Sequence, residues 1–253
     1  MVQFLSQKQE YLDNFRKSVI RSYSSPEEVR LYQEELERGL SRTEKAACRR
    51  YLKPGDAVLD IGCGAGREAM QITDICSRLD CIDLSFPMAA AARNNLDGRA
   101  TVLNCDCTSL PYADGSYDAV LMFNKVLSLV PGKEGRMKAL AEANRVLKPD
   151  GYLIAEVVEA NFTESLLRPI SPILFFDFQV GDKIINSMHY RTTSTGIYVH
   201  SFTGNEILSA TSGAGFRFER RLESILDWLM GTESVLVFRK MHDNHQKMNE
   251  NQR

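Results

Sequence analysis

Long apolar runs, a charge excess of one sign and closely paired cysteines are all missing from this sequence of 253 residues. No apolar run approaches the ~20 residues that a membrane-spanning helix needs. No run of the signal-peptide type follows the polar segment Met1–Glu10. We therefore expect a soluble, cytoplasmic protein with no membrane among its partners.

The charges nearly balance, with 31 Lys and Arg against 33 Asp and Glu and a formal net charge of −2. A protein that is held mainly by nucleic-acid phosphates usually carries a basic excess, so the composition disfavours this class without excluding a local basic patch. Hydrophobic residues make up 43% of the chain and charged residues 25%, which is typical of globular proteins rather than disordered or fibrous ones.

None of the six cysteines belongs to a CxxC pair. Cys105 and Cys107 flank Asp106 with a single residue between them, a spacing that does not suit zinc. Most of the six have apolar neighbours. We expect free cysteines that pack as small hydrophobic residues in a reducing compartment, and no metal site.

Apolar periodicity divides the chain into a helical start and a long region of alternating strands and helices. Ser25-Pro26-Glu27-Glu28 is typical of a helix start, and the apolar stripe after it predicts one helix over about 26–51. The alternation that follows predicts a doubly wound, mostly parallel sheet. Its first five strands are expected at 57–61, 79–84, 100–104, 117–123 and 152–158.

The remainder of the chain departs from this alternation. Residues 160–200 are rich in aromatic and β-branched side chains without a helical period, which predicts a small cap insertion of short strands. The capping box Thr203-Gly-Asn-Glu206 predicts another helix, and the last strands are expected at 216–222 and 235–239. The expected parts are an N-terminal helical extension (1–51), a main domain (52–240) that contains the cap, and a polar, disordered tail (241–253).

The segment Asp60-Ile-Gly62-Cys-Gly64-Ala-Gly66 joins the first expected strand to the next helix. Glycines at such a junction let a ligand approach the backbone, and the helix N-terminus favours an anion there. The pattern is GxGxG, whereas a dinucleotide site would have its third glycine at the position of Arg67. Asp83 ends the second expected strand, where its carboxylate is placed to accept hydrogen bonds from ribose hydroxyls.

Five motifs in this order resemble the class I, Rossmann-like S-adenosylmethionine (SAM)-dependent methyltransferases. They are the glycine loop, Ile82–Met88, Asn104–Pro111, Tyr117–Met122 and Arg145–Gly151. The likeness covers about residues 50–160 and continues more weakly to about 238. It implies a seven-stranded sheet with one antiparallel strand near an edge. It also implies an enzyme that takes a methyl group from SAM and releases S-adenosylhomocysteine.

The resemblance assigns roles at the methionine end of SAM. Gly62, Cys63 and Gly64 would pass under the methionine part, with Cys63 making backbone contacts. Asp60 would lie near the ammonium group, often through water.

On the adenosine end, the resemblance places Asp83 on the ribose, with Leu84 and Met88 against the adenine. Asp106 would accept a hydrogen bond from the adenine amino group, and the backbone of Cys107 would donate one to the ring.

Near the reacting methyl group, Phe123 and Asn124 would border the sulfonium, and Tyr23 would fold over the cofactor as N-terminal residues do in related enzymes. A general base is needed only where the acceptor must lose a proton. The candidates for such a base are Lys125, His189 and His200.

The acceptor atom, whether O, N, C or S, is not given, since residues 123–131 lack the Pro-Pro-Tyr type of motif. The apolar cap favours a closed pocket for a small molecule, and its three basic side chains are matched by three acidic ones. We expect a small-molecule acceptor and a monomer or homodimer. The alternatives are a methyltransferase that acts on tRNA or another nucleic acid, and a non-catalytic SAM-binding protein.

Overall fold

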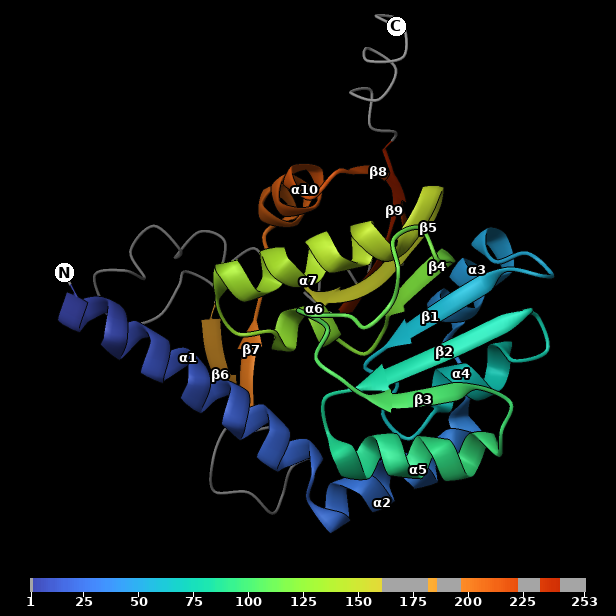
Figure 1. Ribbon diagram of the computed structural model, residues 1–253, viewed down its shortest axis with the longest axis horizontal. Helices are drawn as coiled ribbons and strands as arrows, with labels where there is room; N and C mark the ends of the chain where they lie inside the picture. The colour runs from blue at the N-terminus through green and yellow to red at the C-terminus, as the bar shows by residue number, and fades with distance from the viewer. Residues whose placement is uncertain (1, 161–181, 186–196, 223–232, 242–253) are drawn as a thin grey trace, which may run out of the picture.

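The computed structural model describes residues 2–160, 182–185, 197–222 and 233–241 (Figure 1). A seven-stranded sheet with the order β3-β2-β1-β4-β5-β9-β8 forms its centre. The strands are β1 (Ala57–Ile61), β2 (Arg78–Asp83), β3 (Thr101–Asn104), β4 (Tyr117–Met122), β5 (Leu147–Val158), β8 (Phe216–Leu222) and β9 (Glu233–Lys240). Strands β1 to β5 pair in parallel, and β9 runs antiparallel to both of its neighbours. The predicted fold, with one antiparallel strand beside an edge strand, is confirmed.

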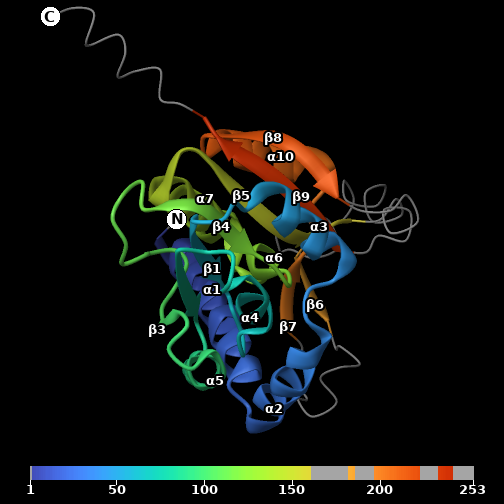
Figure 2. The ribbon, with the colours of Figure 1, turned by 90° about the vertical axis from the view of Figure 1, so that its right-hand side faces the viewer.

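Side chains alternate between the two faces of the sheet, and a layer of helices covers each face (Figures 1 and 2). Leu59 and Ile61 point into one core cluster, together with Leu140 of a covering helix, whereas Val58 belongs to the cluster on the other face. The first face is covered by α6 (Val126–Leu129), α7 (Gly132–Val146) and α10 (Gly204–Gly213). The second face is covered by α3 (Arg42–Tyr51), α4 (Arg67–Ile72) and α5 (Phe86–Leu96).

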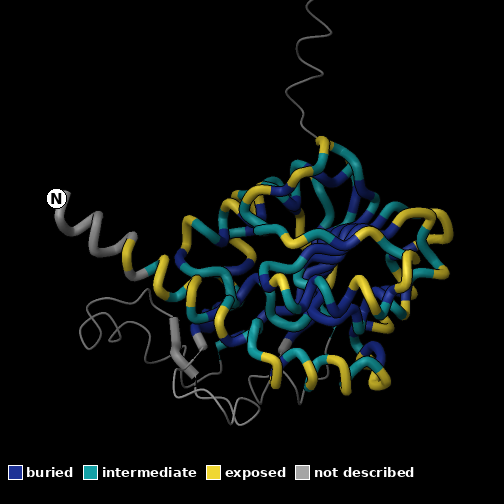
Figure 3. Tube along the Cα trace, turned by 60° about the horizontal axis from the view of Figure 1, so that its bottom comes forward, coloured by how far each residue is buried: buried dark blue, intermediate teal, exposed yellow. Residues whose placement is uncertain are grey.

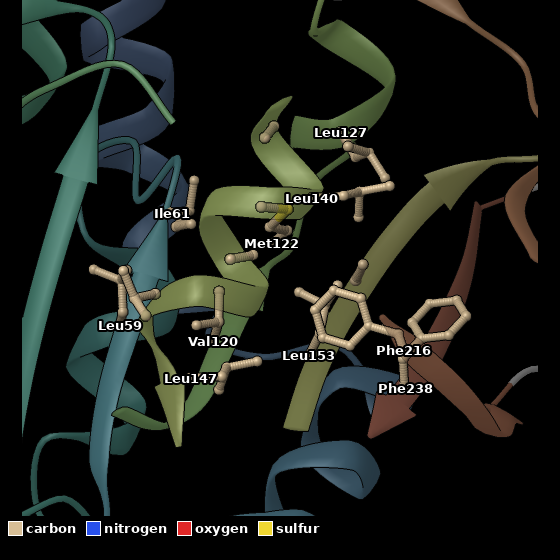
Figure 4. Packing of buried hydrophobic residues seen from close by; sticks show 14 of the residues in the cluster. Leu59, Ile61, Val120, Met122, Leu127, Leu140, Leu147, Leu153, Phe216 and Phe238 are labelled. Carbon is tan, nitrogen blue, oxygen red and sulfur yellow. The ribbon is translucent and has the colours of Figure 1, made fainter. Parts of the chain in front are cut away.

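The buried strands lie at the centre of the molecule, and the helices around them expose their outer sides (Figure 3). On the α7 face, aliphatic and aromatic side chains from five strands and two helices pack together (Figure 4). This packing holds the strand ends in fixed positions, and the loops that leave those ends carry the candidate site.

The N-terminal segment forms several elements: α1 (Val2–Tyr23), α2 (Pro26–Glu34), the short 3-10 helix η1 (Glu35–Arg38) and α3. The expectation of one helix over 26–51 is therefore wrong. Gly39 adopts φ +60°, a left-handed conformation that ends the helical run. Ser41 then begins α3 with a capping box, in which its hydroxyl accepts from the Glu44 N–H and the Glu44 carboxylate accepts from the Ser41 N–H.

Helix α1 crosses in front of the strand ends, and the arrowheads of β1, β2 and β3 point toward it (Figure 1). It also packs against the two-stranded antiparallel sheet of β6 (Asp182–Ile185) and β7 (Ile197–His200), with the rings of Phe15 and Tyr198 5.0 Å apart. These two strands come from the predicted cap. The rest of residues 160–200 beyond Ala160, and the tail after Met241, lie outside the described residues. Over the described part of the chain, no helix combines the length and the apolarity that crossing a membrane would require.

Candidate functional site

A cavity of about 270 Å³ opens where the carboxyl ends of the parallel strands meet. In doubly wound sheets this edge is where ligands bind, because the loops there leave a crevice. Five segments contribute to its walls: α1, α2, the glycine loop, the ends of β2 and β3, and the stretch from Asn124 to α7. The polar and charged lining residues are Asp13, Arg16, Tyr23, Tyr32, Asp83, Ser85, Asp106, Thr108, Asn124, Glu134 and Lys138.

The loop after β1 approaches its neighbours so closely that side chains would not fit. A Cβ atom at Gly62 would lie 2.2 Å from Cγ2 of Val126, and one at Gly64 would lie 3.0 Å from Cδ1 of Tyr32. Both glycines also have positive φ, +76° and +52°, which side chains disfavour. The N–H groups of Gly62 and Cys63 donate to the carbonyl of Ile82 at 2.7 and 3.1 Å, which ties the loop to β2. Bare backbone therefore forms this wall of the cavity.

Asp83, at the end of β2, directs its carboxylate toward the glycine loop. Its two oxygens accept from the N–H of Gly64 at 2.9 Å and from the N–H of Ser85 at 2.8 Å. Burial raises the pKa of Asp83 to about 6, although both hydrogen bonds oppose the rise. The group is thus ionised at neutral pH, fixed in orientation, and able to accept further hydrogen bonds from a ligand.

Asp60 lies beneath the glycine loop and is 1% exposed. Its Oδ2 atom has no hydrogen-bond partner among the described residues. Burial first, and then the nearby carboxylate of Glu68, raise the pKa of Asp60 well above its usual range, and Arg67 lowers it in part. A buried acceptor of this kind costs stability unless a donor reaches it, which makes Asp60 a candidate for binding a cation or an N–H group.

Arg67 joins two buried carboxylates next to this loop. Its guanidinium donates to Glu44 Oε1 at 2.8 Å and to the carbonyl of Gly39 at 2.7 Å, and it also forms an ion pair with Glu68. Burial raises the pKa of Glu68 to about 7, with Arg67 opposing the rise. The cluster connects α3 to the N-terminus of α4 and thereby supports the glycine loop from behind.

The chain that leaves β4 has two consecutive residues in the left-handed region, Asn124 at φ +50° and Lys125 at φ +66°. The N–H of Asn124 donates to Oε2 of the buried Glu156 at 2.6 Å. The amide Nδ2 of Asn124 donates to the hydroxyl of Tyr32 at 3.1 Å. These bonds connect β4, β5 and α2 beside the cavity.

Tyr32, and the residues of α1 other than Tyr23, are parts of the site that the sequence reasoning missed. Leu12, Arg16, Val19 and Tyr23 recur on one face of α1 and line the cavity. Arg16 forms an ion pair with Oδ2 of Asp106. This helical spacing is visible in the sequence and signals an amphipathic helix, but nothing in it says which part of the fold the helix covers.

The structure brings eight of the residues predicted to bind SAM together around the cavity. They are Tyr23, Gly62, Gly64, Asp83, Leu84, Asp106, Cys107 and Asn124.

Four other residues predicted to bind SAM do not line the cavity, because their side chains are buried in the packing behind it. They are Asp60, Cys63, Met88 and Phe123. Met88, predicted to lie against the adenine, is 0% exposed within α5. Phe123, predicted to border the sulfonium, packs in the core on the α5 side of the sheet.

The two candidate bases among the described residues, Lys125 and His200, do not line the cavity. His200 is fully buried, with Nε2 2.8 Å from Oε1 of Glu206 and its ring against that of Phe202. Lys125 precedes α6 but is not part of the lining. His189 lies outside the described residues. The structure therefore supports a structural position for His200 and places neither His200 nor Lys125 in the cavity lining.

Known proteins resemble this chain in both sequence and fold. A family model described as a methyltransferase domain matches residues 59–155. The probable tRNA methyltransferase 9B of Mus musculus is 36% identical over 105 residues, which are 42% of this chain and 22% of that protein. The ubiquinone/menaquinone biosynthesis C-methyltransferase of Syntrophotalea carbinolica is 29% identical over 198 residues, which are 72% of this chain and 78% of that protein.

Among solved structures, the 1,6-didemethyltoxoflavin-N1-methyltransferase of Burkholderia thailandensis, with bound 1,6-didemethyltoxoflavin and S-adenosylhomocysteine, superimposes with a TM-score of 0.64 at 19% identity. The superposition covers 92% of this chain and 90% of that one. The chain spans between 22% and 50% of the length of three of the curated relatives that it matches. The sheet order, the glycine loop beside Asp83 and the match of residues 59–155 to a methyltransferase domain together confirm the resemblance to the class I SAM-dependent methyltransferase family.

Proposed function

We propose that this protein transfers a methyl group from SAM to a small-molecule acceptor. The observation that carries the proposal is the cavity at the strand ends, where the carboxylate of Asp83 is held by two backbone N–H groups against the loop of Gly62 and Gly64. A fixed carboxylate beside a bare backbone loop fits a nucleoside whose ribose hydroxyls donate to the carboxylate.

The residues present fit SAM along the whole cavity. Asp83 would hold the ribose, and Asp106 with the backbone of Cys107 would meet the adenine. Gly62 and Gly64 let Val126 and Tyr32 pack directly against the loop, and the bare backbone of both glycines lines the cavity where a methionine chain would lie. The unpartnered Oδ2 of Asp60 fits the need of an ammonium group for an acceptor, either directly or through water.

When bound, SAM supplies a methyl group that positively charged sulfur has already activated. The task of this chain is then to exclude water and to hold the acceptor in line behind that group, which can lower the barrier by several kcal/mol. Val19 and Ile20 of α1, with Leu129, Val130 and Pro131 before α7, provide an apolar wall for this purpose. Their chemistry favours an acceptor with an apolar or aromatic body.

The small-molecule assignment rests on the way in which α1 covers the cavity. A polynucleotide acceptor would need an open groove with several phosphate-binding cations. The described lining has two cationic side chains, Arg16 and Lys138, against four carboxylates, and Arg16 is paired with Asp106. The similarity to a probable tRNA methyltransferase extends over 105 residues of the core, and it keeps tRNA as the second candidate.

Transfer of labelled methyl from SAM tests the proposal. The protein is incubated with labelled SAM and either a deproteinised metabolite extract or bulk tRNA, and calorimetry measures SAM binding in parallel. We expect roughly micromolar SAM affinity and label in the metabolite fraction. Salt-sensitive labelling of tRNA alone would show that the acceptor is tRNA rather than a small molecule. Tight SAM binding without transfer to either fraction would instead indicate a non-catalytic SAM-binding protein. The variant Asp83→Ala serves as the matched control that should not bind SAM well.

A further inference from the structure

Three side chains from separate elements form a hydrogen-bonded cluster beside the glycine loop. They are Tyr32 of α2, Asn124 after β4 and Glu156 of β5. The tyrosine hydroxyl accepts from the asparagine amide at 3.1 Å, although the two residues are 92 positions apart in the chain. Tyr32 and Asn124 line the cavity, whereas Glu156 is buried next to it.

The asparagine is held in an unfavourable backbone conformation. Asn124 and Lys125 both have positive φ, and conformations of this kind persist where the surroundings enforce them, often at functional sites. The carboxylate of Glu156 accepts the Asn124 N–H at 2.6 Å and thereby helps to fix it. The Asn124 amide in turn orients the hydroxyl of Tyr32. The cluster therefore sets the position of one aromatic ring at the cavity.

One edge of the Tyr32 ring, formed by Cδ1 and Cε1, lies against the glycine loop at Gly64. A Cβ atom at Gly64 would be 3.0 Å from its Cδ1 and 3.3 Å from its Cε1. A second ring, that of Tyr23, stands nearly perpendicular at 5.9 Å, and its carbonyl accepts the hydroxyl of Ser85 at 2.9 Å. The two tyrosines thus stand side by side on the cavity wall: Tyr23 is linked to Ser85, and Tyr32 contacts Gly64 and Asn124.

We propose that Tyr32 is the residue that recognises the positive charge on the sulfur of the methyl donor, and that Asn124 and Glu156 are positioning residues for its ring. This inference rests on the proposed function. The sulfur of SAM is bonded to the carbon next to the ribose ring, so a ribose on Asp83 brings it to the Gly64 side of the cavity. An aromatic face attracts a cation within about 6 Å of its centre, and the attraction increases where water is excluded.

The same ring gives no such attraction to the product, because S-adenosylhomocysteine has a neutral sulfur. A merely structural role of Tyr32 in packing α2 would affect the two nucleosides equally. The ratio of the two affinities therefore separates recognition of charge from support of the fold, and it needs neither turnover nor a known acceptor.

Calorimetry with SAM and with S-adenosylhomocysteine on Tyr32→Leu tests the inference. We expect SAM affinity to fall about tenfold and S-adenosylhomocysteine affinity to fall less than about twofold, since an aromatic–cation contact is worth about 0.5–2 kcal/mol. Tyr23→Leu is the matched control, because its ring lines the cavity beside that of Tyr32 while its carbonyl accepts from Ser85. This variant should weaken the binding of both nucleosides alike. An equal loss of affinity for SAM and for S-adenosylhomocysteine in Tyr32→Leu would overturn the inference.

A shape-conserving pair keeps the test valid if Tyr32→Leu does not fold. Tyr32→Phe is compared with a trifluorinated phenylalanine at the same position, which has nearly the same shape but an electron-poor ring. Fluorination should weaken SAM binding and leave S-adenosylhomocysteine binding unchanged, and unchanged SAM binding would count against the inference. If the wild-type protein binds neither nucleoside, the proposed function itself has failed.

Discussion

The guanidinium of Arg16, on the N-terminal helix, forms an ion pair with the carboxylate of Asp106, in the loop that follows β3. The other carboxylate oxygen of Asp106 accepts the N–H and the hydroxyl of Thr108 at 2.8 and 2.9 Å. The family resemblance assigns this same carboxylate to the adenine of SAM. The position of α1 and the adenine end of the cavity are therefore linked through one acidic side chain.

Breaking this pair should loosen α1 without affecting the sheet. In Arg16→Met, hydrogen exchange measured by mass spectrometry should become up to about fivefold faster for residues 12–23, because a half-exposed ion pair contributes up to about 1 kcal/mol. Exchange in β1 and β4 should stay the same. Arg30→Met is the control, since its ion pair with Glu34 lies exposed on α2, outside the cavity lining. Equal acceleration in both variants would mean that Arg16 does not secure α1.

The raised pKa of Asp83 predicts a pH dependence of SAM binding. The carboxyl is protonated below its pKa of about 6, and the neutral form accepts hydrogen bonds from ribose hydroxyls less well. Affinity should therefore fall by about tenfold between pH 7 and pH 5, measured by calorimetry. Asp83→Asn should bind SAM more weakly at pH 7 and should lose this dependence, because its side chain does not titrate. A dependence that persists in Asp83→Asn would assign the titration to another group.

The same shift affects stability in the opposite direction. A folded-state pKa above the ordinary value of 3.8 means that the folded protein binds the proton more tightly than the unfolded chain. The contribution of Asp83 to the free energy of unfolding is thus largest below about pH 4 and decreases as the pH rises to about 6. Asp83 is ionised at neutral pH at a cost in stability, which supports a role in binding rather than in folding.

The buried charge cluster behind the glycine loop makes a prediction about stability. Arg67→Met leaves the carboxylates of Glu44 and Glu68, which are 1% and 5% exposed, without their cation. Loss of one partner in a buried ion pair typically costs about 3–5 kcal/mol, so urea denaturation at pH 8 should show a loss of this size.

Arg67→Lys is the conservative control for this cluster, because it keeps the charge but not the several hydrogen bonds of the guanidinium. It should lose less stability than Arg67→Met. A loss below about 1 kcal/mol in Arg67→Met would mean that the two carboxylates take up protons at little cost.

Much of the fold can be predicted from the sequence, because strands that are buried between two layers of helices consist of short runs of apolar residues. The glycine loop and Asp83 were identified for the same reason: a strand end followed by a tight turn requires particular residue types at particular positions. The break between α2 and α3 was missed, although Gly39 and the capping box from Ser41 to Glu44 both mark it. The apolar stripe continues across this break, so periodicity alone does not reveal it.

The contacts that complete the cavity were not predictable in this way. The bond between Tyr32 and Asn124 joins residues 92 positions apart, and it depends on how α2 packs against the ends of β4 and β5. Similarly, the apolar stripe of α1 predicts that one face of this helix is buried. It does not indicate which part of the protein the helix packs against. The burial of Met88 and Phe123 reflects the side of their backbone that faces the sheet, which a motif match does not specify.

Gly64 makes the sharpest test of the loop, because the chain contains a matched glycine elsewhere. Gly64→Val should abolish SAM binding, and so should the smaller change Gly64→Ala. The added Cβ would press against Tyr32 at 3.0 Å in a residue with φ +52°. The backbone strain alone costs about 1–2 kcal/mol.

The matched control is Gly115, which has a similar φ of +62° but nothing within 4 Å of its added Cβ, and which lies outside the cavity lining. Gly115→Ala should thus lose comparable stability in thermal denaturation and retain normal SAM affinity in calorimetry. Normal affinity in Gly64→Ala would show that SAM does not pass over this loop, whereas equal loss of affinity in both variants would trace the effect to general destabilisation.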